Sequence, residues 1–439
     1  MRAVRDVLLD VLAPLFKRRD LRENAAAYVR GLLIPKTAGN CWALAEAVGH
    51  AGPGRLQHLL SGAVWDEDEV RDAVRSLIQR RFGTRGVLVF DETGQLKKGT
   101  RTAAVARQYT GTAGRVENAI VAVYTTYATE AGHALIDRDL YVPKTWCTDP
   151  ERMSAAGFTR DHHFATKPQL ARAHAERAVA GGLEPEWAAG DEVYGRSGEL
   201  REWLEQHGIG YVFAVPVDHR VALGGVTRRA DRAPDLVAAA GWNRRSAGAG
   251  SKGARLYDWA WLPTDQAGRH LLIRRSIKNP AEFAFFLCHI PTGRTATLAT
   301  LTRIAGIRWR VEDDFQDAKG AVGLDQTQVR GYRAWKRHAT LAMVALAVLE
   351  SAAAEQRATH PAPVLPHTGD QFPPADCGTI ALTRQEVQRL LDYSAQSASM
   401  PAIVARQHRA FHQHWSDWRR RHQARARWHH YRTRLAFIA

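Results

Sequence analysis

Apolar positions recur at helical spacing through the first 80 residues of the chain. Two series show this spacing: Leu8, Leu9, Val11, Leu12 and Leu15, and later Leu44, Ala47 and Val48. The sequence Gly52-Pro53-Gly54 breaks the pattern, and a further helix is predicted to begin near Asp66. We therefore predict a helical N-terminal domain over residues 1–80.

Short helices joined by tight turns admit two interpretations. With Arg55, Gln57 and His58 at one junction, they resemble a helix-turn-helix DNA-binding unit. Alternatively, they form a helical cap that packs on the main domain. The pattern alone is compatible with both, so residues 1–80 are predicted to be a DNA-binding domain with this alternative left open.

The periodicity changes from Gly86 onward. Predicted strands and helices follow at 87–90, 102–109, 118–126, 134–142, 167–181 (helix), 187–189, 198–206 (helix) and 211–215. The strands come first as an antiparallel hairpin and then alternate with helices. This order predicts an α/β fold with a mixed sheet flanked by helices on both faces.

The alternation stops at residues 217–265, which are rich in glycine and aromatic residues. We predict an inserted β-rich subdomain there. Strands at 270–276 and 282–290 and long helices at 297–324 and 334–356 then follow. The catalytic-domain candidate thus spans 81–356, a Pro-rich linker spans 357–380, and a basic helical C-terminal region spans 381–439.

Composition and charge narrow the class of protein. The 439 residues are 45% hydrophobic and 24% charged, as in folded globular chains, and the net charge is +16. An arginine-rich excess of this size favours a polyanion such as nucleic acid, although a generally basic surface is the simpler alternative.

The cysteines and the apolar runs indicate in which cellular compartment the protein is expected. The four cysteines, Cys41, Cys147, Cys288 and Cys377, are far apart, which argues against zinc binding and against a disulfide framework. Charges interrupt the N-terminal apolar stretch, so no signal peptide is expected, and the longest apolar run, 340–354, is short for a membrane span. A cytoplasmic protein without membrane contact is predicted.

Three acidic residues occupy informative places. Asp91 ends the apolar run Val87–Phe90, Asp191 ends the run Trp187–Gly190, and Glu312 lies in a long helical pattern. An aspartate at the end of a buried strand is unfavourable unless it is paired or bound to metal. Two such aspartates and a helical glutamate are therefore candidate ligands for two divalent cations.

Helical geometry distinguishes Glu312 from its acidic neighbours. At about 100° per residue, Glu312 shares one stripe with Arg308 and Lys319, at the border of the apolar face. The same arithmetic predicts that Asp313, Asp314 and Asp317 face solvent. Taken alone, Arg308 and Glu312 are also compatible with a surface i, i+4 ion pair of a few tenths of a kcal/mol.

The chemistry that suits such a cluster is phosphodiester cleavage. Two Mg²⁺ ions about 3.5–4 Å apart would activate the attacking oxygen and stabilise the leaving oxygen. Three carboxylates without metal repel one another, so at least one pKa is expected to be raised. Glu92 and Glu192 directly follow the aspartates, and strand alternation predicts that they point away from the metals.

Several segments resemble the DDE transposases of bacterial insertion sequences, most closely the insertion sequence seven-hundred-and-one family. They are DETGQLKKG (91–99), ARQYTGTAGRVEN (106–118), LYVPKTW (140–146), TKPQLA (166–171), GDEVYG (190–195), RWRVEDDFQDAKGAVGLD (308–325) and WKRHATLAM (335–343). The segments YVRGLL (28–33) and WSDWRRRHQARARWHHY (415–431) also look familial. The resemblance extends over nearly the whole chain.

This resemblance implies a ribonuclease-H-like fold with a β-rich insertion, in which Asp91, Asp191 and Glu312 are the catalytic metal ligands. Arg308, Glu312 and Lys319 match the larger group's Tyr-x2-Arg-x3-Glu-x6-Lys pattern, but Ala305 stands at its tyrosine position. It further implies two Mg²⁺ ions, with Mn²⁺ as a substitute. The implied partners are double-stranded DNA, as terminal inverted repeats and target DNA, and a second copy in a synaptic homodimer.

Basic residues near these segments are the predicted DNA contacts. They are Arg308, Lys319, Lys97, Lys98, Arg107, Lys167, Arg419, Arg420 and Arg421. For Lys97, Lys98, Arg107 and Lys167 the alternative is ordinary solvated surface charge. The resulting hypothesis is a nucleoid-associated DNA transposase that nicks element ends and transfers the 3′-OH. The alternatives are a domesticated, non-enzymatic DNA-binding protein and a structure-specific nuclease with the same metal site.

Overall fold

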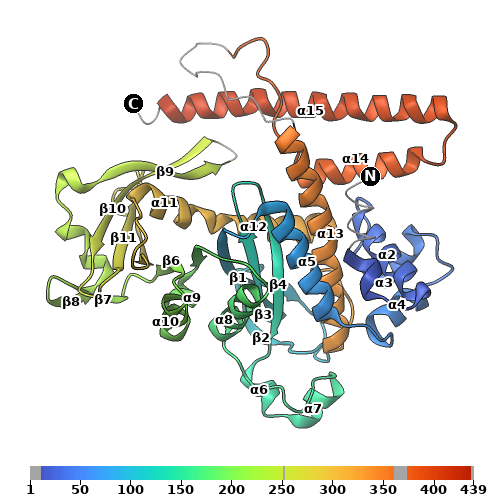
Figure 1. Cartoon of the computed structure of the whole chain (residues 1–439), viewed down its shortest axis with the longest axis horizontal. Coiled ribbons are helices and arrows are strands. Elements are labelled where there is room, and N and C mark those ends of the chain that lie inside the picture. The colour runs from blue at the N-terminus through green and yellow to red at the C-terminus, as the bar shows by residue number, and fades with distance from the viewer. Residues whose placement is uncertain (1–10, 251–252, 360–372, 437–439) are drawn as a thin grey trace.

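The computed structural model describes residues 11–250, 253–359 and 373–436. Its centre is a ten-stranded mixed sheet with the order β2-β3-β1-β5-β6-β12-β11-β10-β9, in which β4 also pairs with β3 (Figure 1). The strands are β1 (Val87–Leu96), β2 (Ala106–Thr110), β3 (Arg115–Ala128), β4 (His133–Tyr141), β5 (Trp187–Gly190), β6 (Gly210–Val215), β9 (Asn243–Gly250), β10 (Gly253–Pro263), β11 (Arg269–Arg275) and β12 (Phe283–His289). Parallel pairing joins β1 to β5 and β5 to β6, and the other pairs are antiparallel.

Helices flank this sheet, as the alternating pattern predicted. The α-helices are α2 (Arg19–Leu33), α3 (Cys41–Ala47), α4 (Gly54–Ser61), α5 (Glu67–Phe82), α6 (Lys144–Cys147), α7 (Pro150–Ala155), α8 (Lys167–Ala180), α9 (Glu192–Gly195), α10 (Gly198–Gln206), α11 (Leu298–Ile307), α12 (Trp309–Val322), α13 (Tyr332–Thr359), α14 (Arg384–Ser397) and α15 (Ala402–Ala436). Short 3-10 turns lie at 13–15, 230–232, 234–236 and 239–241.

Local sequence patterns predicted the positions of several helices and strands. Asp66 caps α5, because its side chain accepts hydrogen bonds from the backbone N–H groups of Asp68 and Glu69. The predicted hairpin forms from β2 and β3. Residues 1–10, which carry part of the first apolar series, lie outside the described residues, as does 360–372 of the expected linker.

The segment 217–265 is β-rich, as expected, but most of it is not a separate sheet. Its strands β9 and β10 extend the main sheet through β11, and the pair β7 (Arg220–Leu223) and β8 (Val226–Arg229) forms a small sheet of its own. In Figure 1 these strands lie at the opposite end of the molecule from α2, α3 and α4.

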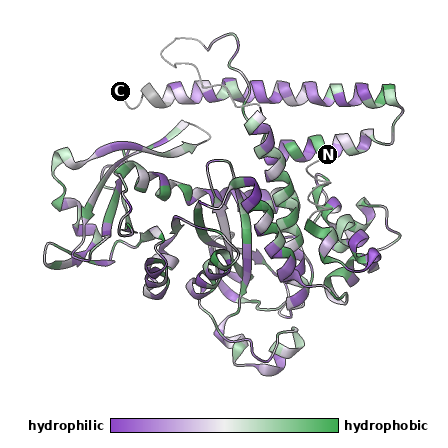
Figure 2. Cartoon of the chain, in the orientation of Figure 1, coloured by the Kyte–Doolittle hydropathy of each residue, from purple (hydrophilic) through white to green (hydrophobic). Residues whose placement is uncertain are grey.

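Helix α13 is the central helix of the core. Its apolar stretch is long enough by composition to cross a membrane, but 83% of that window is buried inside the fold. It packs against α2, α4, α5, β4, α12 and α14. Figure 2 shows its hydrophobic colouring where these elements surround it. Its apolar residues therefore serve the core.

The N-terminal helices are fixed to α12 and α13 by close contacts. Gly39 approaches Gly323 so tightly that an added Cβ would lie 2.5 Å from the Gly323 carbonyl oxygen. Gly323 itself has φ 62° and ends α12 in the left-handed conformation that glycine favours. Next to it, Tyr28 Oη lies 2.8 Å from Nδ1 of the buried His338. These contacts agree with the cap interpretation of residues 1–80, while Arg55, Gln57 and His58 of α4 remain exposed.

Helix α14 covers a side of α12 that was expected to face solvent. The predictions for Asp314 and Asp317 were wrong: Asp314 is fully buried, and Asp317 is only 20% exposed at its side chain. Both carboxylates bind Arg384 of α14, at 2.8 and 3.1 Å. The helical arithmetic identified one buried stripe, but α14 comes from 70 residues further along the chain and covers a second one.

Candidate active site

Parallel pairing of β1 and β5 brings two of the predicted acids together. Phe90 pairs with Gly190, so Asp91 and Asp191 follow at the same level of neighbouring strands. Strand β5 ends there, and Asp191 caps α9 by accepting a hydrogen bond from the Val193 N–H at 2.9 Å. The prediction that a strand ends at Asp91 was wrong, since β1 continues to Leu96 against β3.

Glu312 reaches the same place from α12. The expected single helix is divided at Arg308 into α11 and α12, and Glu312 lies in the first turn of α12. Arg308 joins two of the acids: Nη2 lies 2.7 Å from Glu312 Oε1, and Nη1 lies 3.4 Å from Asp91 Oδ2. The structure thus gathers Asp91, Asp191, Glu312 and Arg308 at the carboxyl end of β5, beside the central strand β1.

The surroundings of the two aspartates disfavour their ionised forms. Burial, followed by the charge of Asp191, raises the pKa of Asp91 to about 7, against the opposing effect of Arg308. Burial and the charge of Glu92 also raise the pKa of Asp191. A cation placed among these groups would relieve their repulsion, and oxygen ligands suit Mg²⁺ and Mn²⁺. The donor set therefore fits the implied metals.

Glu92 is a member of the site that strand alternation excluded. Its carboxylate accepts hydrogen bonds from Lys167 Nζ at 2.6 Å and from Tyr194 Oη at 2.9 Å. Its charge also contributes to the raised pKa of Asp191. Because β5 has already ended, Glu92 can reach α8 and α9 beside the aspartates. The pairing with Lys167, 75 residues away, left no local signal in the sequence.

Two further cations, Lys319 and Lys97, lie along β1 beyond Arg308 and the acids. Lys319 Nζ donates to Thr112 Oγ1 at 2.9 Å, and Thr112 donates to the Gly94 carbonyl at 2.9 Å. Burial lowers the pKa of Lys319. Lys97 Nζ donates to the Thr327 carbonyl at 2.9 Å. Both ammonium groups therefore lie beyond Asp91 in the direction in which β1 runs.

The remaining predicted DNA contacts differ in their surroundings. Lys98 and Arg107 are exposed, on the segment after β1 and on β2. On α15, Arg419 pairs with Glu386 at 2.6 Å and Arg420 donates to the Ile380 carbonyl at 2.8 Å, whereas Arg421 is exposed. Two of these three arginines therefore hold α15 against neighbouring segments.

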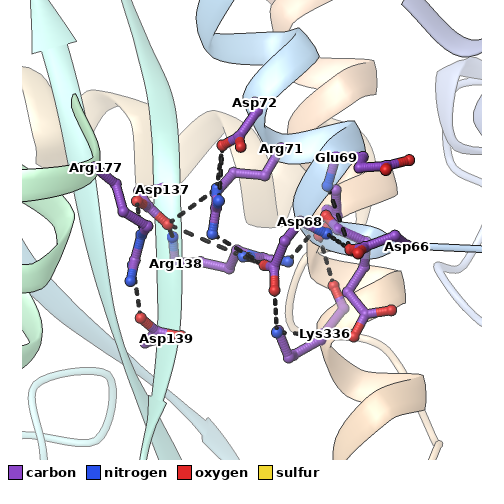
Figure 3. Close-up of polar contacts among 12 residues, drawn as sticks. Asp66, Asp68, Glu69, Arg71, Asp72, Asp137, Arg138, Asp139, Arg177 and Lys336 are labelled. Atoms are coloured by element: carbon purple, nitrogen blue, oxygen red, sulfur yellow. Dashed lines mark hydrogen bonds and ion pairs between the residues drawn. The ribbon is translucent and has the colours of Figure 1, made fainter. Parts of the chain in front are cut away.

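A second acidic cluster lies between β4 and α8. Asp137, Asp139 and His174 have ligand atoms within 4.8 Å of one another, which is closer than the three acids at Asp91 within the described chain. Arg177, however, binds both aspartates, at 2.8 and 2.7 Å, and Arg138 lies beside them (Figure 3).

The charges of this second cluster are already balanced by protein cations. Burial opposes ionisation of Asp137, but His174 and Arg177 hold its pKa below the usual value. Arg138 also pairs with Asp68 of α5 at 2.9 Å, and Lys336 of α13 pairs with the same carboxylate at 2.8 Å. This network joins four elements and does not fit a metal ion.

Comparisons with known proteins define the class. A family model described as DDE superfamily endonuclease matches residues 11–236. A second, described as transposase DDE domain, matches residues 160–348. The first match covers more than half of the chain, so the chain belongs to the DDE superfamily of endonucleases. The first match contains Asp91 and Asp191, and the second contains Asp191 and Glu312.

Within that class, the chain is similar to a probable transposase for insertion sequence element IS701 from Microchaete diplosiphon. The two are 31% identical over 183 residues, which is 41% of this chain and 45% of the relative's length. Among solved structures, a piggyBac transposase synaptic complex with hairpin DNA matches over 93% of this chain and 82% of the other. The identity there is 10% and the TM-score is 0.42, too low to establish a common fold.

Proposed function

We propose that the chain is a DNA transposase that cuts the ends of a mobile element and transfers the 3′-OH to target DNA. The observation that carries this proposal is the meeting of Asp91 and Asp191, from paired strands, with Glu312 and Arg308, in a chain of the DDE superfamily. The basic composition agrees with a DNA substrate.

The roles of the residues follow from their geometry. Asp91, Asp191 and Glu312 would hold two Mg²⁺ or Mn²⁺ ions, which supply the activated oxygen nucleophile and neutralise the leaving oxygen. Arg308, already at the carboxyl end of β5, is placed to bind a phosphate beside the carboxylates. Lys167 orients Glu92 through its ion pair and borders the same site.

Lys97, Lys98, Arg107, Lys319 and the exposed Arg421 would contact the DNA backbone, whereas Arg419 and Arg420 would act chiefly by positioning α15. We further propose that the enzyme binds terminal inverted repeats and assembles as a homodimer around two element ends. It would act in the cytoplasm on DNA of the nucleoid.

Conservative substitutions test the catalytic assignment. Asp91→Asn, Asp191→Asn and Glu312→Gln should each lower Mg²⁺-dependent cleavage of an element-end duplex by at least about a hundredfold, because each removes a charged metal ligand. Binding of the same duplex should persist. Cleavage and strand-transfer products are measured on labelled DNA.

Asp313→Asn is the matched control, since Asp313 is adjacent to Glu312 on the same helix but pairs with Arg310 at 3.7 Å. Cleavage undiminished in Glu312→Gln would contradict the site. Cleavage without strand transfer would indicate a nuclease instead, and binding without cleavage by the wild type would indicate a domesticated DNA-binding protein.

A further inference from the structure

A polar hollow of about 700 Å³ lies where β1 ends, beyond the acidic site. It is lined by the segment 95–102 and by Gln326, Thr327, Gln328 and Arg330, which follow α12. A second hollow of about 420 Å³ shares Gln326 and Gln328 with the first and is also lined by Lys36, Thr37, Ala38 and Asn40. We call these two adjoining hollows the basic trough.

The charges of the trough are of one sign. Lys36, Lys98, Arg101 and Arg330 are exposed, and none of them forms an ion pair within the described parts of the chain. Lys97 lies deeper, where burial lowers its pKa to about 8. The lining residues include no acid, although Asp325 is close enough to interact with Lys97. Such a surface attracts an anion.

The trough is held in a defined position relative to the catalytic strand. The Gly39 N–H donates to Gln326 Oε1 at 2.8 Å, and Gln95 Nε2 and Lys97 Nζ both donate to the Thr327 carbonyl at 2.9 Å. These bonds join the N-terminal segment, the end of β1 and the loop after α12. The cations are therefore presented by a fixed framework.

The spacing along β1 sets a distance. Asp91 and Lys97 are six residues apart, and an extended strand rises about 3.3 Å per residue, so the separation is roughly 20 Å. Duplex DNA advances about 3.4 Å per base pair, so this length corresponds to about six base pairs. Lys319, bonded through Thr112 to Gly94, lies between the two ends.

The residues that line the trough favour duplex DNA over a single strand. Proteins that hold single strands combine cations with aromatic platforms on which bases stack. The residues that line the trough in the described structure contain no aromatic side chain. They offer amide, hydroxyl, ammonium and guanidinium groups, which suit the sugar-phosphate backbone of a duplex.

We propose that the basic trough binds the phosphate backbone of duplex DNA about six base pairs from the phosphate that is cut at Asp91. The trough thereby orients the DNA across both the N-terminal helices and the catalytic sheet. This inference rests on the proposed function for its distance from the cut, but not for its affinity for duplex DNA.

The test removes three exposed charges, in the variant Lys98→Gln/Arg101→Gln/Arg330→Gln. Binding to a fluorescent 40-base-pair duplex is measured by anisotropy at several salt concentrations. Each lost phosphate contact lowers the slope of log K against log salt by about 0.9, so the slope should fall by about two to three. The control Arg80→Gln/Arg81→Gln/Lys278→Gln removes as many exposed charges from α5 and from the β11–β12 turn, and its slope should stay within about one of the wild type.

The outcomes separate the two proposals. A slope unchanged in the trough variant overturns the trough, even if the wild type cleaves DNA normally. A slope reduced in a protein that never cleaves DNA supports the trough and rejects the transposase. An equal loss of affinity for a single-stranded oligonucleotide of the same length would contradict the assignment to a duplex.

Phosphate ethylation interference on a cleaved duplex then fixes the position. With the wild type, ethylation of phosphates about six base pairs from the cut should interfere with binding, and this interference should be absent with the trough variant. Interference lost at other phosphates instead would overturn the placement. Thermal unfolding at the wild-type temperature shows that the variant is folded.

Discussion

At the scale of single residues, the environment of Asp91 shows the electrostatics of the candidate site most clearly. Its carboxyl group is 14% exposed, lies beside Asp191, and has a pKa raised to about 7 by burial and like charge. The Arg308 guanidinium and a hydrogen bond from the Glu92 backbone N–H, at 2.8 Å, oppose these effects on the pKa. Sequence patterns identified Asp91 as costly to bury, but they did not reveal Glu92, whose partners Lys167 and Tyr194 lie far away in the chain.

The raised pKa of Asp91 predicts a pH-dependent stability in metal-free buffer. The folded pKa, about 7, is above the unfolded value of 3.8, so the contribution of Asp91 to stability is greatest below pH 3.8 and is lost as pH rises toward 7. Asp91→Asn lacks this loss. Its free energy of unfolding should therefore rise, relative to that of the wild type, by up to about 1.4 kcal/mol per pH unit between pH 3.8 and pH 7.

Denaturant unfolding in EDTA between pH 4.5 and pH 8 measures this difference, with Asp313→Asn as the control. A difference between Asp91→Asn and the wild type that is constant with pH would show that Asp91 is already ionised in the folded protein.

At the scale of elements, packing of α14 decides the environment of α12. Arg384 is 4% exposed and binds Glu350 at 2.7 Å, Asp314 at 2.8 Å and Asp317 at 3.1 Å. It also donates to the His133 carbonyl at 2.8 Å. One arginine thus neutralises acids from α12 and α13, and it fastens the C-terminal region to the helix that carries Glu312.

Removing this arginine should be strongly destabilising. Arg384→Ala removes one cationic partner from each of the buried acids Asp314 and Glu350, leaving His133 beside Asp314 and Arg357 beside Glu350. Removing one partner of a buried ion pair typically costs about 3–5 kcal/mol. Arg389→Ala on the same helix is the matched control, because Arg389 is 47% exposed and its partner Glu386 keeps an ion pair with Arg419 at 2.6 Å when Arg389 is removed. Equal unfolding midpoints for the two variants would refute the role given to Arg384.

At the scale of the whole molecule, three regions meet around α13. The N-terminal helices, the sheet and α14 all pack on it, and the ion network of Asp68, Arg138 and Lys336 joins α5, β4 and α13 (Figure 3). The long helix α15 crosses above them and contacts β10 near the far end of the sheet (Figure 1). The basic trough lies at one of these junctions, between Lys36 and Arg330.

The contact between Gly39 and Gly323 predicts how firmly the N-terminal helices are attached. Gly39→Ala places a methyl group 2.5 Å from a backbone oxygen, and relief of such a clash typically costs about 1–3 kcal/mol. Gly52→Ala is the control, since no atom lies within 4 Å of its added Cβ. Thermal unfolding and limited proteolysis between the N-terminal helices and β1 measure the effect, and a Gly39→Ala protein as resistant as the control would contradict it.

The sequence by itself determined the features that depend on neighbouring residues. Helical and strand periodicity, the Asp66 cap, the β2–β3 hairpin and the net charge are local or additive properties, so one chain suffices to predict them. The strand-end position of Asp191 and the helical stripe that singled out Glu312 and Arg308 are of the same kind.

Only the tertiary structure decided which distant residues share an environment. The burial of Asp314 by α14, the pairing of Glu92 with Lys167, the extension of the sheet by β9 and β10, and the trough between residues 36–40, 95–102 and 326–330 all join segments remote in sequence. Periodicity shows that a face is buried but does not show against what, because burial is a property of the packed chain and not of any one element.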